Sequence, residues 1–467
     1  MPTAEKKARN IGDLRRSGYK ILSVREEMRK NLIEKIKKGE KLFPGIIGFE
    51  DTVIPQLENA LLAGQDIILL GERGQAKSRV ISQLVTLLDN EVPFIAGCEI
   101  NDNPFKPICR ACRDKVDRDG ESVEIAWLPR DDRYAEKLAT PDISMGDLIG
   151  DVDPIKIAEG RYLSDELAIH YGLIPRTNRG IFAINELPDL SERIQVGLFN
   201  LMEERDVQIK GYRVRLPLDV FLVASANPED YTNRGRIITP LKDRYGAHIR
   251  THYPKTLKQE IEIVEEEYTQ FPDTSEKMKV PQYMKEIVAE ITALARRSAD
   301  INQSSGVSVR MSIANYESMV SNAFKRSLKY GEVAVPRISD LPAIMASTIG
   351  KIELETVEEG REPRIVEDLT KKAVASIFGH YLSPASLSEV LKRFDEGSAI
   401  ETGADIPSSE YVKRLKDWGP MAEAVHKLAE DQSPAAQASA MELVLEGLHL
   451  NRKVNKDRLE GRFKYRV

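Results

Sequence analysis

The sequence is poor in cysteine and contains no long hydrophobic run. Its three cysteines cannot form a disulfide framework in a chain of 467 residues, which favours a reducing compartment. No run of about 18 apolar residues is present, so no membrane-spanning helix is predicted. The charged segment MPTAEKKARN is not followed by the apolar core of a signal peptide. We therefore expect a cytoplasmic protein without a membrane span.

An excess of positive charge is missing as well. The 68 lysines and arginines against 74 acidic residues give a net charge of −6, which argues against unaided binding along nucleic acid. Hydrophobic residues make up 41% of the chain, which is enough for sizeable cores. The length suggests about three structural units.

The chain is organised around residues 67–78, which read IILLGERGQAKS. Four apolar residues predict a buried strand, and a helical pattern begins after the loop. A strand that enters a helix through a glycine-bearing loop binds phosphate groups, with the lysine at the outer phosphates and the next hydroxyl at Mg²⁺. The predicted ATP-binding residues are Gly71, Arg73, Gly74, Gln75, Ala76, Lys77, Ser78 and Arg79, with Ser78 as the Mg²⁺ ligand.

Two features near this loop allow a second interpretation. Ala76 stands where a glycine usually precedes the lysine, so the alternative is an ordinary strand-to-helix turn with an incidental lysine. Upstream, Ile46 and Ile47 form a short apolar loop. This loop is interpreted equally well as a cover for the adenine of a nucleotide or as core packing.

Two further apolar strands end in polar residues. Residues 181–184 precede Asn185 and Glu186, and residues 220–224 are followed closely by Asn227. In phosphate-loop ATPases such strands place an acidic residue at Mg²⁺ and a carboxylate that orients the attacking water. We predict that Glu186 orients the water, that Asn185 takes the Mg²⁺ position without its usual charge, and that Asn227 contacts the γ-phosphate or the water. A solvated strand end for Glu186 and a turn residue for Asn227 are the alternatives.

Several arginines come later in the chain. Arg234 and Arg236 are followed by Arg244 in the segment LKDRYG, and Arg310 opens a helical segment. An arginine near residue 244 either reaches the nucleotide of a neighbouring subunit or forms a surface ion pair. Arg310 either swings over the phosphates from the start of a lid helix or is a solvated first-turn residue.

All three cysteines fall between residues 98 and 112. Cys109 and Cys112 form a CxxC pair that fits one tetrahedral metal ion, and Cys98 is a candidate third ligand for Zn²⁺. A fourth ligand is then a carboxylate such as Asp102, the distant His170, or water. A set of small buried residues in a cytosolic protein is the alternative interpretation.

Taken together, these motifs resemble the AAA+ ATPases, and within them the MoxR and magnesium-chelatase I-subunit group. The segments that carry the resemblance are GERGQAKS, AGCEIN, the lead into the acidic strand, SANPED and LKDRYG, within residues 43–350 or so. The resemblance implies that Lys77 and Ser78 bind the nucleotide. It further implies four catalytic residues. These are Glu186 as the catalytic carboxylate, Asn227 as the first sensor, Arg244 as the arginine finger and Arg310 as the second sensor.

The expected fold class is α/β, an AAA+ phosphate-loop core with a parallel sheet flanked by helices, then an α-helical lid and a helical C-terminal region. The expected division is an N-terminal helical arm at 1–42, the core at 43–255 with an inserted hairpin at about 143–173, the lid at 256–355 and a helical C-terminal domain at 356–467.

The leading functional hypothesis is an ATP-hydrolysing ring motor, expected to be a hexamer, because a finger acting in trans places the nucleotide between subunits. The resemblance implies remodelling of a partner protein or help with metal or cofactor insertion, commonly with a von Willebrand factor A domain partner. A nucleotide-gated scaffold with little hydrolysis is the second hypothesis, motivated by Asn185. A DNA-directed AAA+ protein is the third, and the acidic balance and the lack of a helix-turn-helix or a GAFTGA loop disfavour it.

Overall fold

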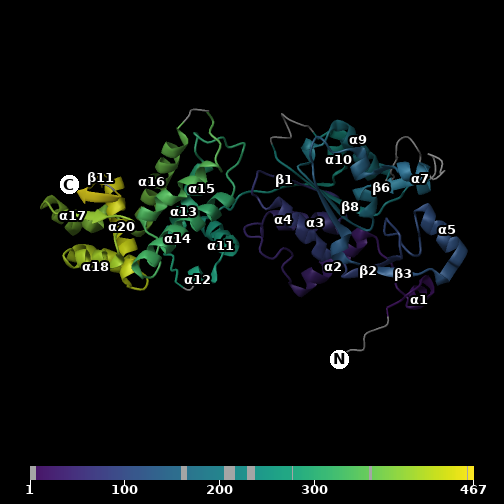
Figure 1. Cartoon of the computed structure of the whole chain (residues 1–467), viewed down its shortest axis with the longest axis horizontal. Helices are drawn as coiled ribbons and strands as arrows, with labels where there is room; N and C mark the ends of the chain where they lie inside the picture. The colour runs from purple at the N-terminus through teal and green to yellow at the C-terminus, as the bar shows by residue number, and fades with distance from the viewer. Residues whose placement is uncertain are drawn as a thin grey trace, which may run out of the picture. The chain divides into compact units, whose positions relative to one another are not determined.

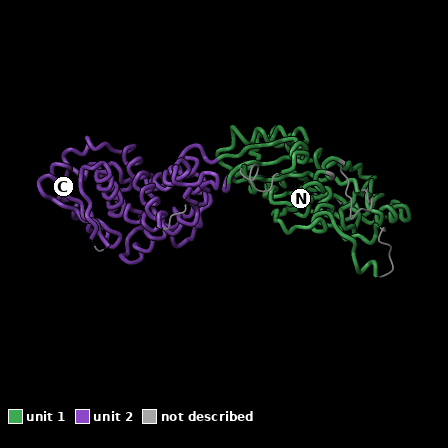
Figure 2. Tube along the Cα trace, turned by 90° about the horizontal axis from the view of Figure 1, so that it is seen from above, with its two compact units in different colours: residues 1–72, 76–252 green, residues 73–75, 253–467 purple. Residues whose placement is uncertain are grey.

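A computed structural model describes residues 7–158, 166–204, 216–228, 237–275, 277–356, 360–459 and 461–467. The chain divides into two compact units (Figure 2). The first unit contains residues 1–72 and 76–252, and the second contains residues 73–75 and 253–467. The described part of the chain holds no helix that is both long and apolar enough to cross a membrane. The four-part division expected from the sequence stays a prediction.

A five-stranded parallel sheet forms the centre of the first unit (Figure 1). Its order is β4-β7-β8-β1-β9. The strands are β4 Tyr134–Leu138, β7 Gly180–Asn185, β8 Val220–Ala226, β1 Ile67–Leu70 and β9 Ala247–Arg250. The central strands β1 and β8 are buried at every position, as expected for a parallel sheet covered on both faces.

Successive strand residues alternate between two separate cores. On one face, Ile67 and Leu69 pack with α2, α3 and α4. On the other face, Ile68 and Leu70 pack with residues of α8, α9 and α10. The alternation follows from the two-residue period of a strand, and it produces a sheet between two helical layers. The predicted fold class is confirmed.

The helices and short strands of the first unit surround this sheet. The helices are α1 Ile11–Arg16, α2 Val24–Lys38, α3 Val53–Leu62, α4 Lys77–Gln83, α5 Arg110–Asp119, α6 Met145–Leu148, α7 Pro154–Ala158, α8 Leu173–Arg176, α9 Glu192–Glu204 and α10 Thr239–Arg244. Two antiparallel pairs add β2 Glu91–Ile95 with β3 Ile125–Pro129, and β5 Gly150–Val152 with β6 Ile169–Tyr171.

Several sequence predictions concern the edges of this unit. The pair β5–β6 occupies the segment expected as an inserted hairpin, of which residues 159–165 lie outside the described part. Arg234 and Arg236 also lie outside the described residues. The predicted N-terminal arm contains α1 and α2, and the buried Leu32 and Met28 of α2 join the core under α3.

The second unit is mainly helical. Its α-helices are α11 Leu257–Glu267, α12 Pro272–Ser275, α13 Gln282–Ala295, α14 Arg310–Tyr330, α15 Met345–Ile349, α16 Glu362–Tyr381, α17 Ser388–Asp395, α18 Ser408–Lys416, α19 Gly419–Leu428 and α20 Pro434–Leu450. Helices α16 and α20 pack closely at Gly447, where an added Cβ would lie 2.1 Å from the ring of Phe378. One continuous core runs through these helices other than the short α12.

The end of the chain adds a small sheet that the sequence did not predict. Strands β10 Ile400–Thr402, β12 Arg462–Arg466 and β11 Asn455–Leu459 form an antiparallel sheet in the order β10-β12-β11. These strands are short and carry many charged residues, and the alternation of Phe463 and Tyr465 with charged residues in β12 is too brief to predict a sheet.

Candidate functional site

The phosphate loop connects β1 to α4, as predicted. Gly74 has a φ of +75°, and Ala76 has a φ of +55°. A left-handed backbone favours glycine, which explains why glycine is usual at the position that Ala76 occupies. Lys77 begins α4, and its side chain is buried.

A row of polar side chains crosses the ends of the central strands. The Lys77 Nζ donates to the Asn227 Oδ1 at 2.9 Å, and the Asn227 Nδ2 donates to the Glu186 Oε2 at 3.0 Å. The Lys77 Nζ also donates to the carbonyl oxygens of Gly71 and, at 2.9 Å, of Glu72. The structure therefore brings together three of the predicted site residues, which follow β1, β7 and β8, although Lys77 and Asn227 are 150 positions apart.

Asn185 lies beside this row and is held at both ends of its amide. Its Nδ2 donates to the Glu136 Oε1, and its Oδ1 accepts from the Ser225 Oγ at 3.1 Å. The Ser225 Oγ also accepts from the Glu186 backbone N–H at 3.3 Å. Sequence reasoning missed Glu136 and Ser225. Each is a polar residue near the carboxyl end of a strand that neighbours β7. Such a residue can be assigned to the site only when the strand order is known.

Glu186 has a left-handed backbone, with a φ of +54° and a ψ of +47°. A non-glycine residue in this region carries strain, and such strain concentrates at functional sites where the surroundings hold it in place. The hydrogen bond that the Glu186 backbone N–H donates to the Ser225 Oγ, and the one that the Glu186 carboxylate accepts from Asn227, supply that restraint.

The other residues of the predicted ATP site have different surroundings. Ser78 and Arg79 are exposed in the first turn of α4, whereas Gln75 is buried. Arg73, which is 70% exposed, lies 3.8 Å from Glu353, with which it shares the second unit. Ile46 is buried in the core next to α3, and Ile47 is half-buried.

The structure also describes Arg244 and Arg310, the two arginines that the sequence predicts to take part in catalysis. Arg244 ends α10, pairs with Glu203 and lies 5.5 Å from the centre of the Phe199 ring. Its ion pair is thus made with a carboxylate of α9. Arg310 is exposed at the first position of α14, in the second unit. Their roles in catalysis stay predictions.

The donor set near the row is suited to a nucleotide with Mg²⁺. A buried lysine with an exposed hydroxyl next to it supplies a cation for phosphate and an oxygen for Mg²⁺. The carboxylates of Glu186 and Glu136 and the Asn185 carbonyl add further hard oxygen atoms. Oxygen atoms of this kind are the ligands that Mg²⁺ prefers.

A second group of chemically reactive side chains lies elsewhere in the first unit. The Sγ atoms of Cys98, Cys109 and Cys112 and a carboxylate oxygen of Asp102 all lie within 4.8 Å of one another. All three cysteines are free thiols. Of the fourth ligands considered from the sequence, the structure therefore places Asp102 in the cluster, while His170 is exposed on β6. The cluster could hold a metal ion.

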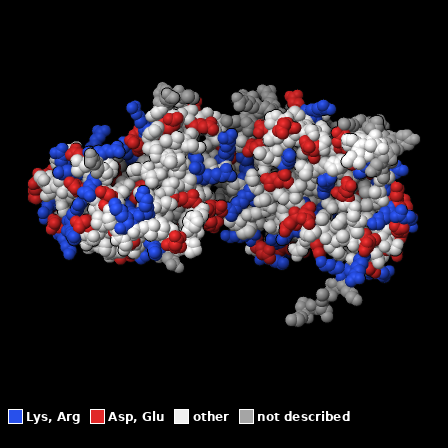
Figure 3. Space-filling view, in the orientation of Figure 1, with Lys and Arg blue, Asp and Glu red and all other residues white. Residues whose placement is uncertain are grey.

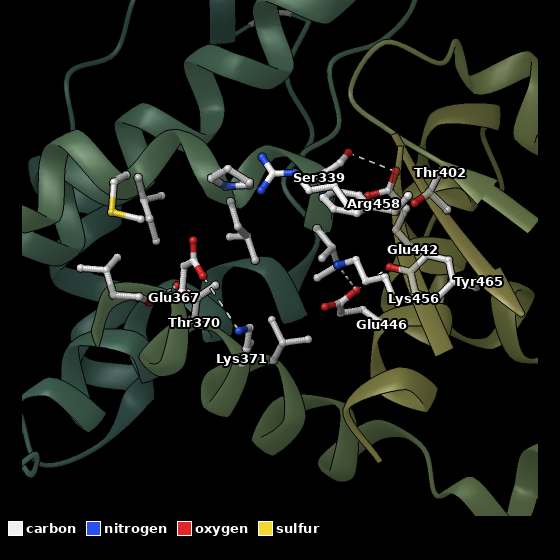
Figure 4. A pocket seen from close by; sticks show the side chains of 18 residues that line it. Ser339, Glu367, Thr370, Lys371, Thr402, Glu442, Glu446, Lys456, Arg458 and Tyr465 are labelled. Carbon is white, nitrogen blue, oxygen red and sulfur yellow. Dashed lines mark hydrogen bonds and ion pairs between the residues drawn. The ribbon is translucent and has the colours of Figure 1, made fainter. Parts of the chain in front are cut away.

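The second unit contains a cavity of about 250 Å³ between α16, α20 and the C-terminal sheet (Figure 4). Two buried glutamates face it, and both are paired within the protein. Glu446 accepts from the Lys456 Nζ at 2.7 Å and from the Tyr465 hydroxyl, and burial together with Glu446 raises the pKa of Tyr465 well above its usual value. Glu442 accepts from Ser339 at 2.7 Å and 3.1 Å. The two glutamates of the cavity are thus paired with other protein groups, and no sequence motif predicted the cavity.

The visible face of the molecule carries both signs of charge. Lysine and arginine side chains alternate with aspartate and glutamate side chains over each unit on this face (Figure 3). A mixed surface of this kind lacks the continuous basic stripe that typically binds a phosphate backbone.

Comparison with known proteins gives one consistent relationship. The sequence is similar to magnesium-chelatase subunit ChlI of Nostoc sp., at 28% identity over 265 residues, which are 55% of this chain and 64% of that protein. It is also similar to a magnesium-chelatase subunit ChlI homolog of Methanocaldococcus jannaschii, at 27% identity over 244 residues, 50% of this chain and 60% of that protein. The match therefore spans less than two thirds of either relative.

No protein-family model matches the sequence. Among solved structures, the chain is similar to one in a complex of the magnesium-chelatase subunits BchI and BchD, with 20% identity, a TM-score of 0.35, and coverage of 70% of this chain and 98% of that one. At that TM-score the structural likeness supports no conclusion about this chain. The sequence relationship and the phosphate-loop core together support distant homology of this chain to the magnesium-chelatase I subunits.

Proposed function

We propose that this protein hydrolyses ATP at the row formed by Lys77, Asn227 and Glu186. The observation that carries the proposal is the pair of hydrogen bonds that joins these three side chains at the carboxyl ends of parallel strands. Ligands of open α/β sheets bind at this edge. Distant homology to ChlI subunits supports an ATPase, and the detailed activity is our proposal.

Each residue of the row has a distinct role in this proposal. Lys77 binds the outer phosphates of ATP, and the Glu186 carboxylate orients the attacking water and accepts its proton. Asn227 holds Glu186 and Lys77 at a fixed separation and reports the γ-phosphate. The Ser78 hydroxyl and, at the second position, Asn185 would hold Mg²⁺, which would neutralise charge on the phosphates.

The assembly of the protein is a further part of the proposal. We infer a ring, most simply a hexamer, in which Arg244 reaches the nucleotide of the next subunit and Arg310 reports the nucleotide state. Relatives in the chelatase group support work on a partner protein, by remodelling or by metal or cofactor insertion, with a von Willebrand factor A domain protein as the partner class. A cytoplasmic location is consistent with the three free thiols.

A nucleotide-gated scaffold is the second candidate function. Asn185 favours it, because an uncharged amide at the Mg²⁺ position weakens metal binding and slows hydrolysis without preventing ATP binding. Turnover per subunit at saturating Mg-ATP separates the two candidates. A scaffold binds ATP tightly and releases almost no phosphate.

The test compares Lys77→Ala and Glu186→Gln with wild type. We expect ATP hydrolysis to fall by about 100-fold or more in each variant, since each removes a group that acts on the reacting phosphate. Lys77→Ala should also weaken ATP binding, whereas Glu186→Gln should leave it nearly unchanged. Lys41→Ala and Glu192→Gln, at exposed positions of the first unit, are matched controls. Wild-type turnover in both site variants would show that the row does not hydrolyse ATP.

A further inference from the structure

The cysteine cluster has the geometry of a single-metal site. Its four donor atoms lie within 4.8 Å of one another and come from positions 98, 102, 109 and 112. A tetrahedral Zn²⁺ with bonds of about 2.3 Å to sulfur separates its ligand atoms by about 3.8 Å, so one ion fits among these donors after small side-chain movements. The donors are too close together to surround a larger iron–sulfur cage.

The Asp102 side chain is an independent indication of a cation-binding site. The residue is fully buried, and its Oδ2 accepts hydrogen bonds from the backbone N–H groups of Ile108 at 3.1 Å and Cys109 at 3.0 Å. Its Oδ1 is also buried, but it has no hydrogen-bond partner. Leaving a buried carboxylate oxygen unpaired is costly, and a metal ion removes that cost. One oxygen is thus fixed by the backbone and the other is left without a partner, in a residue whose carboxylate belongs to the cluster.

Backbone donors also hold the sulfur ligands. The Cys98 Sγ accepts from the Asp102 backbone N–H, and the Cys109 Sγ accepts from the Cys112 backbone N–H, both at 3.4 Å. Such contacts orient metal ligands and stabilise the negative charge of thiolates. Thiolates are soft ligands that select Zn²⁺ over Mg²⁺ or Ca²⁺. A disulfide would use only two of the three cysteines and would leave Asp102 unpaired.

The loop that carries the cluster supports the entry to β7. The Asn101 Nδ2 donates to the carbonyl oxygen of Arg176 at 2.8 Å, and the buried Asn178 Nδ2 donates to the carbonyl oxygen of Ile100 at 3.0 Å. Residues 176–179 lead directly into β7, whose far end carries Asn185 and Glu186. An ion that orders residues 98–112 therefore also stabilises the turn before this strand.

We propose that Cys98, Asp102, Cys109 and Cys112 bind one structural Zn²⁺ ion, which orders the loop between β2 and α5 and thereby supports residues 176–179. Four protein ligands close the coordination sphere, so the ion has a structural and not a catalytic role. The proposal does not depend on ATP hydrolysis.

Metal content is the first test. We expect the full-length protein, purified without added metal, to contain about one Zn²⁺ per chain by mass spectrometry, and Cys109→Ser to lose it. Co²⁺ exchanged into the site should give a thiolate-to-cobalt absorption band. All three cysteines of the chain belong to the cluster, so such a band reports this site alone. A wild-type protein that binds no Zn²⁺ even with excess metal, that contains iron, or that forms a Cys109–Cys112 disulfide would overturn the proposal.

The Asp102 ligand has its own test. Asp102→Asn should weaken Zn²⁺ binding by about 10- to 100-fold in competition with a chromophoric chelator and should retain the cobalt–thiolate band. Asp117→Asn, at an exposed position of α5, is the matched control and should bind as wild type does. Equal affinities of the two variants would remove Asp102 from the site.

Measurements on wild-type protein keep the test valid if a cysteine variant does not fold. Removal of Zn²⁺ by a chelator should lower the melting temperature and speed hydrogen exchange at the amides of residues 98–112 and 176–179, and added Zn²⁺ should reverse both effects. Unchanged exchange at residues 176–179 after metal removal would refute the supporting role.

Discussion

Ala76 and Glu186 share a left-handed backbone at the two ends of the candidate site. This conformation costs an L-residue about 1–2 kcal/mol because its Cβ approaches the backbone. At Ala76 the loop must turn sharply into α4, and at Glu186 the chain turns away from β7. The surrounding chain therefore imposes the left-handed conformation on both residues, against their intrinsic backbone preference.

Ala76→Gly tests this strain. Removing the Cβ relieves the left-handed conformation, while the greater freedom of glycine in the unfolded chain offsets part of the gain. We expect the free energy of unfolding in urea to stay the same or to rise by up to about 1 kcal/mol, with nucleotide affinity retained. Ala76→Val should lower both, because a β-branched residue fits this conformation poorly. Equal losses in the two variants would contradict the role of backbone strain.

Glu136 compensates for the uncharged Asn185 in our interpretation of the site. The two side chains are hydrogen-bonded, so Glu136 places a carboxylate beside the expected Mg²⁺ position. We expect Glu136→Gln to raise the Mg²⁺ concentration needed for half-maximal ATP hydrolysis several-fold. The exchanged variant Glu136→Gln with Asn185→Asp should restore it, because the negative charge returns to the same place.

The control for this exchange is Asp132→Asn, at an exposed position before β4. Its Mg²⁺ dependence should equal that of wild type. Asn185→Asp alone sets two carboxylates against each other, and like charges at that distance disfavour ionisation of both. If Glu136→Gln leaves the Mg²⁺ requirement unchanged, Glu136 has no part in metal binding.

At the scale of elements, a buried ion pair fixes α2 to the sheet. Arg133, immediately before β4, donates to both carboxylate oxygens of Glu27 at 2.7 Å and 2.6 Å, and the exposed fraction of each side chain is 3% or less. The Arg133 Nε also donates to the carbonyl oxygen of Arg179 at 2.8 Å. At the same place, a Cβ on Gly180 would lie 2.1 Å from the Arg133 carbonyl oxygen, so only glycine fits. The N-terminal segment is thus integral to the first unit.

Removing one partner of this pair should be strongly destabilising. Glu27→Ala leaves the Arg133 charge buried without compensation, and we expect a loss of about 3–5 kcal/mol in the free energy of unfolding. The double variant Glu27→Met with Arg133→Met should recover much of that loss, since it leaves neither charge of this pair buried. Denaturant titration followed by circular dichroism measures both.

The exposed pair of Arg15 and Glu121 is the matched control for this prediction. Its side chains are 65% and 56% exposed, so solvent screens their attraction. Glu121→Ala should change stability little. A similar loss in Glu121→Ala and Glu27→Ala would show that burial does not determine the cost.

At the scale of the whole molecule, the proposed ring places parts of one active site on two subunits. Arg244 reaches the site of a neighbour in this proposal, while Lys77 and Glu186 act within their own chain. Complementation between inactive variants can therefore reveal the ring directly.

Mixing Glu186→Gln with Arg244→Ala tests the shared site. Each variant alone should hydrolyse ATP slowly. A mixed ring contains interfaces that combine an intact Glu186 with an intact Arg244 from the next subunit, so we expect hydrolysis to exceed the sum of the separate variants. Light scattering with ATP gives the mass of the assembly. No recovery in a confirmed mixed oligomer would place the action of Arg244 within its own chain.

Much of the first unit was predictable from local sequence. The strands around residues 67–70, 181–184 and 220–224 are short and uniformly apolar, and the polar residues after them have a clear meaning in a parallel sheet. The C-terminal sheet was not predictable, because its strands carry charge at most positions and are stabilised by contacts with distant helices.

The sequence by itself determined the phosphate loop, the strands that carry Glu186 and Asn227, and the cysteine spacing, because each depends on residues near one another in the chain. The tertiary structure decided which of these residues meet. The order of the strands brings Lys77 together with Asn227 and Glu186. It also places Glu136 beside Asn185. The packing of the loop after β2 places Asp102, and not His170, with the cysteines. Sheet register and loop packing are set by contacts between distant segments, and no local pattern encodes them.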